Sequence, residues 1–203
     1  MRQPRKAGLV FVLSSPSGGG KTTVVRALLK RLPELSRSVS VTTRPPRPTE
    51  RGGADYRFIS VGAFRRLRQQ GRLLEWAKVH QAYYGTPNAP VERALAKGHD
   101  CILCIDVQGA RQVRRRCGSR AVLMFLAPPS LKDLEARLIK RRTESPEAIR
   151  RRLAAARREL ACVRWYDYVV VNRRLEQAIG QLEAIVTAEH LRVHPNQTTT
   201  RFM

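Results

Sequence analysis

Short apolar segments alternate with longer amphipathic segments along most of this chain of 203 residues. The short segments are continuous or rich in β-branched side chains, which is typical of strands buried on both faces, and they occupy residues 9–13, 101–105, 121–126 and 168–171. The longer segments carry apolar residues three or four positions apart, which predicts helices at residues 22–32, 108–116, 131–142, 147–163 and 175–191. This alternation indicates an α/β fold with a parallel sheet covered by helices on both faces.

Two of the predicted helices have clear starting residues. Ser130 with Asp133 forms a capping pair, and Ser145 precedes Pro146, a residue favoured in the first turn of a helix. Between residues 38 and 90 the pattern changes to short alternating segments at 38–41, 56–60 and 73–80, with one helix at 61–70. We therefore expect a small β-rich lobe inserted into the α/β core, with an extended, proline-rich surface loop at residues 44–53.

The length of the chain is sufficient for one well-buried domain, so we expect a single domain over residues 1–203. Neither a stretch of membrane-spanning length nor a signal peptide is visible, so we expect a cytoplasmic protein without a membrane partner. Its four cysteines do not suggest a disulfide scaffold. Cys101 and Cys104 form a CxxC pair, but side chains three apart on a strand point to opposite faces, so we expect packing rather than chelation.

The net charge of +23, from 39 Lys and Arg against 16 Asp and Glu, predicts an anionic partner. Nucleic acid is the general expectation for so basic a chain, although arginines that bind nucleotide phosphates would supply part of the excess. Much of the excess lies at residues 111–116 and 150–158, where solvated helix faces are the simpler interpretation. The few aromatic residues lie in predicted core and lobe segments rather than in a stacking platform, so no specific nucleic acid partner is expected.

The segment Ser-Pro-Ser-Gly-Gly-Gly-Lys-Thr at residues 15–22 lies between the first predicted strand and the first predicted helix. Consecutive glycines let the backbone turn tightly and direct its N–H groups inward, Lys21 adds a positive charge, and Thr22 offers a hydroxyl to Mg²⁺. Ser15 stands where the GxxxxGK[ST] pattern has its first glycine, and a glycine-rich turn with a chance lysine is the alternative interpretation. We predict a phosphate-binding loop.

A second candidate site follows in the inserted segment. Arg44 and Arg47 lie three residues apart in the proline-rich loop, and such a pair can hold a phosphate group from two sides. Tyr56 and Tyr84 provide phenol groups, and Glu75 precedes Trp76 at the end of a short apolar run. Taken singly, each has an ordinary structural interpretation as an exposed arginine, a half-buried tyrosine or a glutamate on a solvated strand.

Together, these segments resemble the guanylate kinases in order, residue type and spacing: TTRPPR at 42–47, EW at 75–76, YYGT at 83–86 and IDVQG at 105–109. The resemblance covers residues 9 to about 185. It implies a P-loop NTPase-like fold with a core at 8–37, 91–130 and 159–192, a GMP-binding lobe at 38–90 and a helical lid at 131–158. It also implies transfer of the γ-phosphoryl group of ATP to GMP, and to dGMP, with Mg²⁺, giving ADP and GDP in purine nucleotide synthesis and salvage.

The resemblance implies roles for individual residues. GMP would be bound by Ser40, Arg44, Arg47, Tyr56, Glu75, Tyr84, Thr86 and Asp106. ATP would be bound by Ser15, Pro16, Ser17, Gly18, Gly19, Gly20, Lys21, Thr22, Thr23 and Asn172. Lys21, Arg44, Arg137, Arg141 and Arg152 would be catalytic, and Thr22 would hold Mg²⁺, with Asp106 acting through water. The carboxylate of Glu75 suits guanine, because it can accept hydrogen bonds from N1–H and the 2-amino group but meets an acceptor at N1 of adenine.

Some positions depart from the family pattern. Cys104 stands where the family usually has a second aspartate, two residues before Asp106, and Arg173 and Arg174 replace two residues that are usually acidic. A catalytically inactive guanylate-kinase-like module that binds phosphopeptides is the main alternative, and the intact residues 18–22 argue against it. Related kinases for other small phosphates also remain open, although Glu75 favours GMP. The oligomeric state is left undecided.

Overall fold

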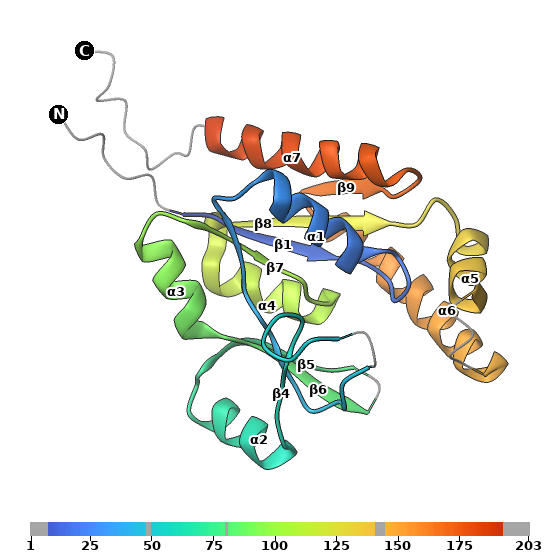
Figure 1. Cartoon of the computed structure of the whole chain (residues 1–203), viewed down its shortest axis with the longest axis horizontal. Coiled ribbons are helices and arrows are strands. Elements are labelled where there is room, and N and C mark those ends of the chain that lie inside the picture. The colour runs from blue at the N-terminus through green and yellow to red at the C-terminus, as the bar shows by residue number, and fades with distance from the viewer. Residues whose placement is uncertain (1–7, 48–49, 80, 141–144, 193–203) are drawn as a thin grey trace.

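A parallel sheet of five strands forms the centre of the protein (Figure 1). The structure is a computed structural model that describes residues 8–47, 50–79, 81–140 and 145–192. All neighbouring strands of this sheet run parallel. The strands, in order across the sheet, are β2 (Leu35–Arg37), β7 (Asp100–Leu103), β1 (Val10–Ser14), β8 (Ala121–Ala127) and β9 (Tyr168–Val171).

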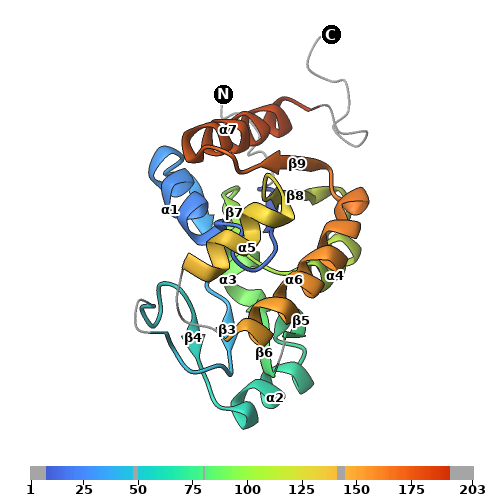
Figure 2. The ribbon, with the colours of Figure 1, turned by 90° about the vertical axis from the view of Figure 1, so that its right-hand side faces the viewer.

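Helices cover both faces of this sheet (Figures 1 and 2). α1 (Lys21–Arg31) and α7 (Leu175–Leu191) pack on one face, and α3 (Asn88–Ala96) and α4 (Val107–Cys117) pack on the other. Every residue of β1 is therefore buried, and its alternate side chains enter the two separate cores. Each fully buried Val, Leu or Phe contributes about 1.5–3 kcal/mol, which explains the continuous apolar strands.

A second, smaller sheet lies beside the carboxyl ends of the central strands. Its order is β4 (Arg57–Phe58), β3 (Val41–Thr42), β6 (Ala82–Pro87) and β5 (Leu73–Val79), and α2 (Val61–Gln69) packs against it. β6 runs antiparallel to both of its neighbours, whereas β3 and β4 run parallel. Figure 1 shows this sheet and α2 below the central sheet.

The smaller sheet has its own apolar core and is joined to the main body by an ion pair. Val41, Phe64 and Leu73 are buried in this core. The carboxylate of Asp55 accepts hydrogen bonds from Arg26 of α1 at 2.7 and 2.9 Å. Burial alone would raise the pKa of Asp55, but the backbone N–H of Arg51 and the guanidinium of Arg26 outweigh this and hold the pKa below its ordinary value. The ion pair therefore links the lobe to the helix that begins at the phosphate loop.

A third unit consists of α5 (Leu131–Lys140) and α6 (Pro146–Ala161), which pack together through Leu134, Leu138 and Ala156. Both predicted helix starts are confirmed, because the N–H of Asp133 donates to Ser130 and that of Ala148 donates to Ser145. Two short 3₁₀ helices follow α4 and α6, at Gly118–Arg120 (η1) and Val163–Trp165 (η2).

The predicted parallel sheet with helices on both faces is confirmed, as is the β-rich insertion. Two strands and one α-helix of the described structure were absent from the prediction: the short edge strand β2, strand β6 and helix α3. Cys101 and Cys104 do enter opposite cores, as predicted, and the four cysteines are free thiols. Over the described ranges, the helices are too short or too polar to cross a membrane.

Candidate active site

The phosphate loop connects the carboxyl end of β1 to the first residue of α1. Gly18 and Gly20 adopt φ values of 95° and 94°, a region that L-residues with side chains rarely occupy. A Cβ at Gly20 would also lie 2.6 Å from Nδ2 of Asn172. The Nζ of Lys21 donates to the carbonyl of Ile105 at 3.2 Å, which holds the ammonium group beside the ends of β1 and β7. The loop therefore presents backbone N–H groups, a helix N-terminus and one cation to the same space.

Ser15, in place of the usual first glycine, is accommodated inside the loop. Its hydroxyl donates to the carbonyl of Pro16 at 3.2 Å and occupies the place that a Cβ on Gly19 would need. Position 19 therefore needs a glycine because the side chain of Ser15 leaves no room for a Cβ, and not because the backbone has a positive φ there.

Asn172 supports the phosphate loop, and Arg137 in turn contacts Asn172. Nδ2 of Asn172 donates to the carbonyl of Gly19 at 2.8 Å, and Nη2 of Arg137 donates to the carbonyl of Asn172 at 2.8 Å. Asn172 is buried, with 7% of its surface exposed. From α6, Nη1 of Arg152 donates to the hydroxyl of Ser17. These contacts connect β9, α5 and α6 to the loop.

Arg44 lines the same site and is held by contacts that include Tyr84, Glu50 and Tyr56. Its Nε donates to the phenol oxygen of Tyr84 at 3.0 Å, and its Nη2 donates to Glu50 at 2.8 Å. The ring of Tyr56 packs edge-on against Tyr84, with 5.9 Å between the ring centres, and lies 5.7 Å from the guanidinium carbon of Arg44. The backbone N–H of Arg47 donates to the second oxygen of Glu50 at 2.9 Å. The two predicted arginines and two predicted tyrosines therefore form one cluster.

Glu75 provides a buried carboxylate on β5. It is 2% exposed, and its Oε1 accepts a hydrogen bond from Thr86 at 2.6 Å. The hydroxyls of Thr86 and Ser40 lie 3.5 Å apart. Burial is the main cause that raises the pKa of Glu75 to about 7, with a smaller contribution from the charge of Asp106, while Thr86 and Lys21 act in the opposite direction. A ligand that donates hydrogen bonds to this buried carboxylate would stabilise its ionised form.

Asp106 caps α4 at the end of β7, the edge of a parallel sheet where ligands usually bind. Its Oδ1 accepts from the backbone N–H of Gly109 at 2.9 Å, and its Oδ2 accepts from Nε2 of Gln108 at 3.1 Å. Gly109 also lies against the carboxylate of Glu75, so that a Cβ there would overlap Oε2. The IDVQG segment therefore positions two carboxylates at once.

These groups surround one cavity of about 770 Å³, within the range of ligand pockets. The predicted residues that line it are Ser15, Pro16, Ser17, Gly18, Gly19, Gly20, Lys21, Thr22, Thr23, Ser40, Arg44, Arg47, Tyr56, Glu75, Tyr84, Asp106 and Arg152. Thr86 is a buried partner of Glu75, Asn172 contacts the loop, and Arg137 contacts Asn172; neither Asn172 nor Arg137 lines the cavity. Arg141 lies outside the described residues.

The sequence model of the guanylate kinase family matches residues 8–189. The chain belongs to the guanylate kinase family. The guanylate kinase of Chelativorans sp. (strain BNC1) is 50% identical over 188 residues, covering 93% of this chain and 86% of that protein. The guanylate kinase of Rhizobium etli (strain ATCC 51251 / DSM 11541 / JCM 21823 / NBRC 15573 / CFN 42) is 48% identical over 190 residues, covering 94% and 86%.

A solved structure agrees with this assignment. The crystal structure of guanylate kinase from Anaplasma phagocytophilum superposes with a TM-score of 0.80 at 33% identity, covering 93% of this chain and 89% of that chain. The P-loop NTPase-like fold predicted from the sequence is thus confirmed for this guanylate kinase family member.

Several cavity residues were missed by sequence reasoning. Glu159 of α6 faces Lys21 and Asp106; burial raises its pKa to about 7, and the charge of Lys21 opposes this. It lies seven residues, or about two helical turns, after Arg152 and so shares a helix face with that predicted residue. Cys162 lies one turn further along and also lines the cavity. Both Glu159 and Cys162 follow Arg152 at helical spacing, and this spacing could have identified them from the sequence.

The departures from the family pattern differ in their surroundings. Cys104 lines the cavity, and burial raises the pKa of its thiol although Arg37 and Lys21 act in the opposite direction. A neutral thiol therefore stands where the family usually has a carboxylate. Arg173 and Arg174 are exposed at the turn before α7, and nothing in the structure explains why they are basic.

Proposed function

We propose that the protein catalyses phosphoryl transfer from ATP to GMP, giving ADP and GDP. The observation that carries this proposal is that the phosphate loop and the buried Glu75 line the same cavity. The loop suits an oligophosphate, and Glu75 suits the donor edge of guanine. An intact loop argues against the alternative of an inactive phosphopeptide-binding module.

The residues predicted from the sequence would form two sets, one that binds ATP and one that binds GMP. The backbone N–H groups of residues 18–20 and the ammonium of Lys21 would bind the ATP phosphates. Arg44, Arg47, Tyr56 and Tyr84 would bind the phosphate of GMP, while Glu75, assisted by Thr86 and Ser40, would accept hydrogen bonds from the base. Asp106 lies between the two groups. This arrangement would place the acceptor oxygen in line with the γ-phosphorus, and phosphoryl transfer needs little covalent help from the protein.

The remaining arginines would stabilise charge on the transferring group. Arg152 already contacts the phosphate loop, and Arg137 is joined to Asn172 behind it. We infer that residues 131–158 act as a lid and residues 38–90 as the GMP-binding lobe, with residues 8–37, 91–130 and 159–192 as the core. Closure of both over the cavity would exclude water, which would otherwise accept the phosphoryl group. Arg141 would be another arginine of this lid.

The donor groups at the loop suit a magnesium ion. Mg²⁺ usually binds one or two protein oxygens together with substrate phosphates and waters, and Thr22 with Asp106 would provide this small set. Over the described residues, His, Cys, Asp and Glu side chains do not form a cluster of three or more that could hold a metal. When bound, the ion would neutralise charge on the phosphates. The free cysteines further favour a reducing, cytoplasmic location.

A steady-state assay of ADP release, with ATP and a panel of GMP, dGMP, AMP, UMP and CMP, tests the proposal. GMP and dGMP should be turned over and the other nucleotides should react far more slowly. Lys21→Ala should lower kcat more than about 100-fold, because it removes a charge that stabilises the donor phosphates. Lys30→Ala, at an exposed lysine in the last turn of the same helix, is the matched control and should leave kcat unchanged. Undiminished GDP formation by Lys21→Ala would exclude this mechanism.

A further inference from the structure

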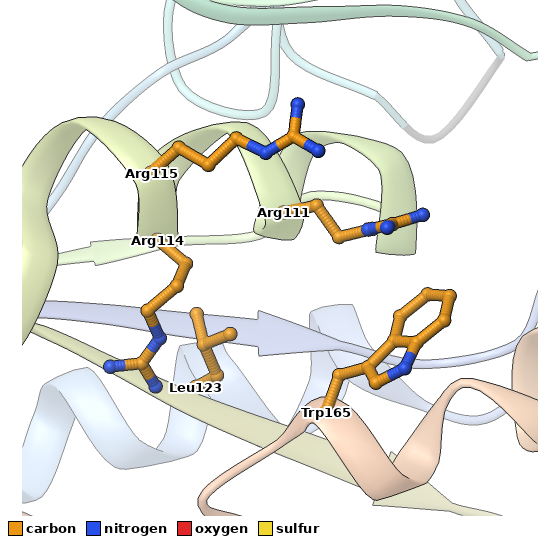
Figure 3. Close-up of a pocket in the computed structure, with 5 residues that line it drawn as sticks. All are labelled: Arg111, Arg114, Arg115, Leu123 and Trp165. Carbon is orange, nitrogen blue, oxygen red and sulfur yellow. The ribbon is translucent and has the colours of Figure 1, made fainter.

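A second hollow lies where α4, β8 and η2 meet. Its volume is about 210 Å³, and the residues that line it are Arg111, Arg114, Arg115, Leu123 and Trp165. Figure 3 shows Arg111 extending from α4 above the indole of Trp165, Arg114 pointing toward Leu123, and Arg115 extending away from that ring. None of these residues lines the nucleotide cavity, so the hollow is a separate feature. We call Arg111, Arg115, Arg164 and Trp165 the Arg-Trp surface.

The positive charge of this surface is not balanced by nearby carboxylates. Arg114 also lines the hollow but is left out of this surface, because it pairs with Asp167 and donates to the carbonyl of Ala121 at 2.8 Å. Within the described ranges, Arg111, Arg115 and Arg164 form no ion pair, and α4 contains no acidic residue. Arg111 and Arg115 are one helical turn apart, about 6 Å along the axis, so their charges repel each other. An anionic partner would relieve that repulsion.

Trp165 is held at the surface by cations rather than buried. It is 38% exposed, the guanidinium carbon of Arg111 lies 4.2 Å from its ring centre, and that of Arg164 lies 5.9 Å away. Such contacts stabilise an exposed indole and fix its orientation. Trp165 lies in the core segment expected from the sequence, residues 159–192, but its ring is exposed rather than packed inside. An exposed aromatic ring bordered by arginines is the arrangement on which nucleic acid bases stack.

We propose that the Arg-Trp surface binds single-stranded nucleic acid without sequence preference. A base stacks on Trp165 or continues its stack with Arg111, while Arg115 and Arg164 pair with the flanking phosphates. A free nucleotide fits less well, because the hollow is smaller than the roughly 300–1,000 Å³ of enclosed ligand pockets. A duplex would offer the phosphates but keep its bases stacked away from the ring. An acidic peptide would satisfy the arginines without using the indole.

The experiment measures fluorescence anisotropy of a labelled single-stranded RNA, longer than the roughly 4–16 nucleotides that such sites cover. Saturating ADP and GMP are present throughout, so that the nucleotide cavity is closed to the RNA. Trp165→Ala should weaken binding roughly 5- to 150-fold, the loss of one stacked base. Trp165→Phe keeps a ring and should retain most of the affinity. Arg111→Ala with Arg115→Ala should reduce the slope of log K against log salt by about 0.7 per lost phosphate contact.

Arg65→Ala with Arg66→Ala is the matched control, because it removes two exposed arginines from another helix, α2. These four variants lie outside the proposed nucleotide site and should keep kinase activity, which verifies their folding. The proposal is overturned if the control pair weakens binding as much as the Arg111 and Arg115 pair, since net charge alone would then explain it. It is also overturned if Trp165→Ala binds normally, if duplex RNA binds as tightly, or if polyglutamate competes equally well, the last indicating an acidic protein partner.

Discussion

Glu50 joins Arg44 and Arg47 through the two oxygens of one carboxylate. Oε1 accepts from the guanidinium of Arg44 at 2.8 Å, and Oε2 accepts from the backbone N–H of Arg47 at 2.9 Å. Burial alone would raise the pKa of Glu50, but these two hydrogen bonds outweigh it and hold the pKa below its ordinary value. An ionised Glu50 therefore holds the side chain of Arg44 and the backbone of Arg47 together.

Replacing Glu50 should weaken GMP binding without affecting ATP. Glu50→Ala removes hydrogen bonds to a charged group, each contributing about 1.5–3 kcal/mol, so the KM for GMP should rise roughly 10- to 150-fold. Glu176→Ala is the matched control, because Glu176 also pairs with an arginine, Arg31, but on the outer surface. Steady-state kinetics with each substrate varied in turn would check this. An equal rise in the KM for ATP would contradict a specific role at the acceptor site.

Adding one methyl group at Gly109 should disturb base selection. The Cβ of Gly109→Ala would overlap Oε2 of Glu75, so the carboxylate must move from its place beside Thr86. A displacement of about 1 Å can lower catalysis on the order of 100-fold, so kcat/KM for GMP should fall while that for AMP changes little. Gly180→Ala, in α7 with open space around it, should leave both values unchanged. Retained discrimination in Gly109→Ala would show that Glu75 does not select the base.

Glu75 should make the stability of the nucleotide-free protein depend on pH. Its pKa is raised from 4.5 to about 7 by burial, so the folded state binds more protons than the unfolded state between these values. The contribution of Glu75 to the free energy of unfolding should therefore be largest below about pH 4.5. It should fall by up to about 3 kcal/mol as the pH rises to 7.

Urea unfolding of the wild type and Glu75→Gln across this pH range would measure the effect. The difference in unfolding free energy between the two proteins should shift in favour of Glu75→Gln as the pH rises, because glutamine does not ionise. A difference that stays constant from pH 4.5 to pH 7 would show that Glu75 ionises normally in the folded protein.

Asn172 should matter to both stability and ATP. Asn172→Ala removes the buried hydrogen bond to the carbonyl of Gly19, so the protein should lose about 1–3 kcal/mol and the KM for ATP should rise. Asn88→Ala offers a close comparison, because Nδ2 of Asn88 donates to the carbonyl of Gly71 at 2.9 Å, far along the chain from the phosphate loop. Urea unfolding and ATP kinetics should separate the two variants. Equal effects on the KM for ATP would remove the loop-supporting role.

The phosphate loop and the central strands could be predicted because short-range patterns determine them. Glycines before a lysine, after a continuous apolar strand, leave few alternatives, and strands buried on both faces are recognisable without any knowledge of their partners. Helix α3 was missed because Pro90 interrupts its first turn, although a helix can accept proline there, where the backbone N–H has no partner within the helix. Strand β2 is only three residues long and carries no alternation.

The contacts within the site could not be predicted, because they depend on which segments meet. Glu50 belongs to a polar loop that looks solvated, and only the fold brings it to Arg44. Asn172 was predicted to contact adenine, and that role stays a prediction; its observed hydrogen bond goes to a residue 153 positions away. Trp165 follows a long amphipathic helix and would be assigned to a core from its size alone.

The β-rich lobe leaves the central sheet from β2 and returns through α3 to β7, and these two strands are hydrogen-bonded neighbours, with Leu35 opposite Asp100. An insertion whose two ends adjoin can be exchanged without altering the strand order of the host. The groups proposed to recognise the acceptor base therefore lie on an insertion that can be exchanged as a unit, whereas the phosphate loop belongs to the central α/β domain. A change of acceptor could evolve by remodelling residues between β2 and β7, with the phosphoryl-donating half of the molecule left intact.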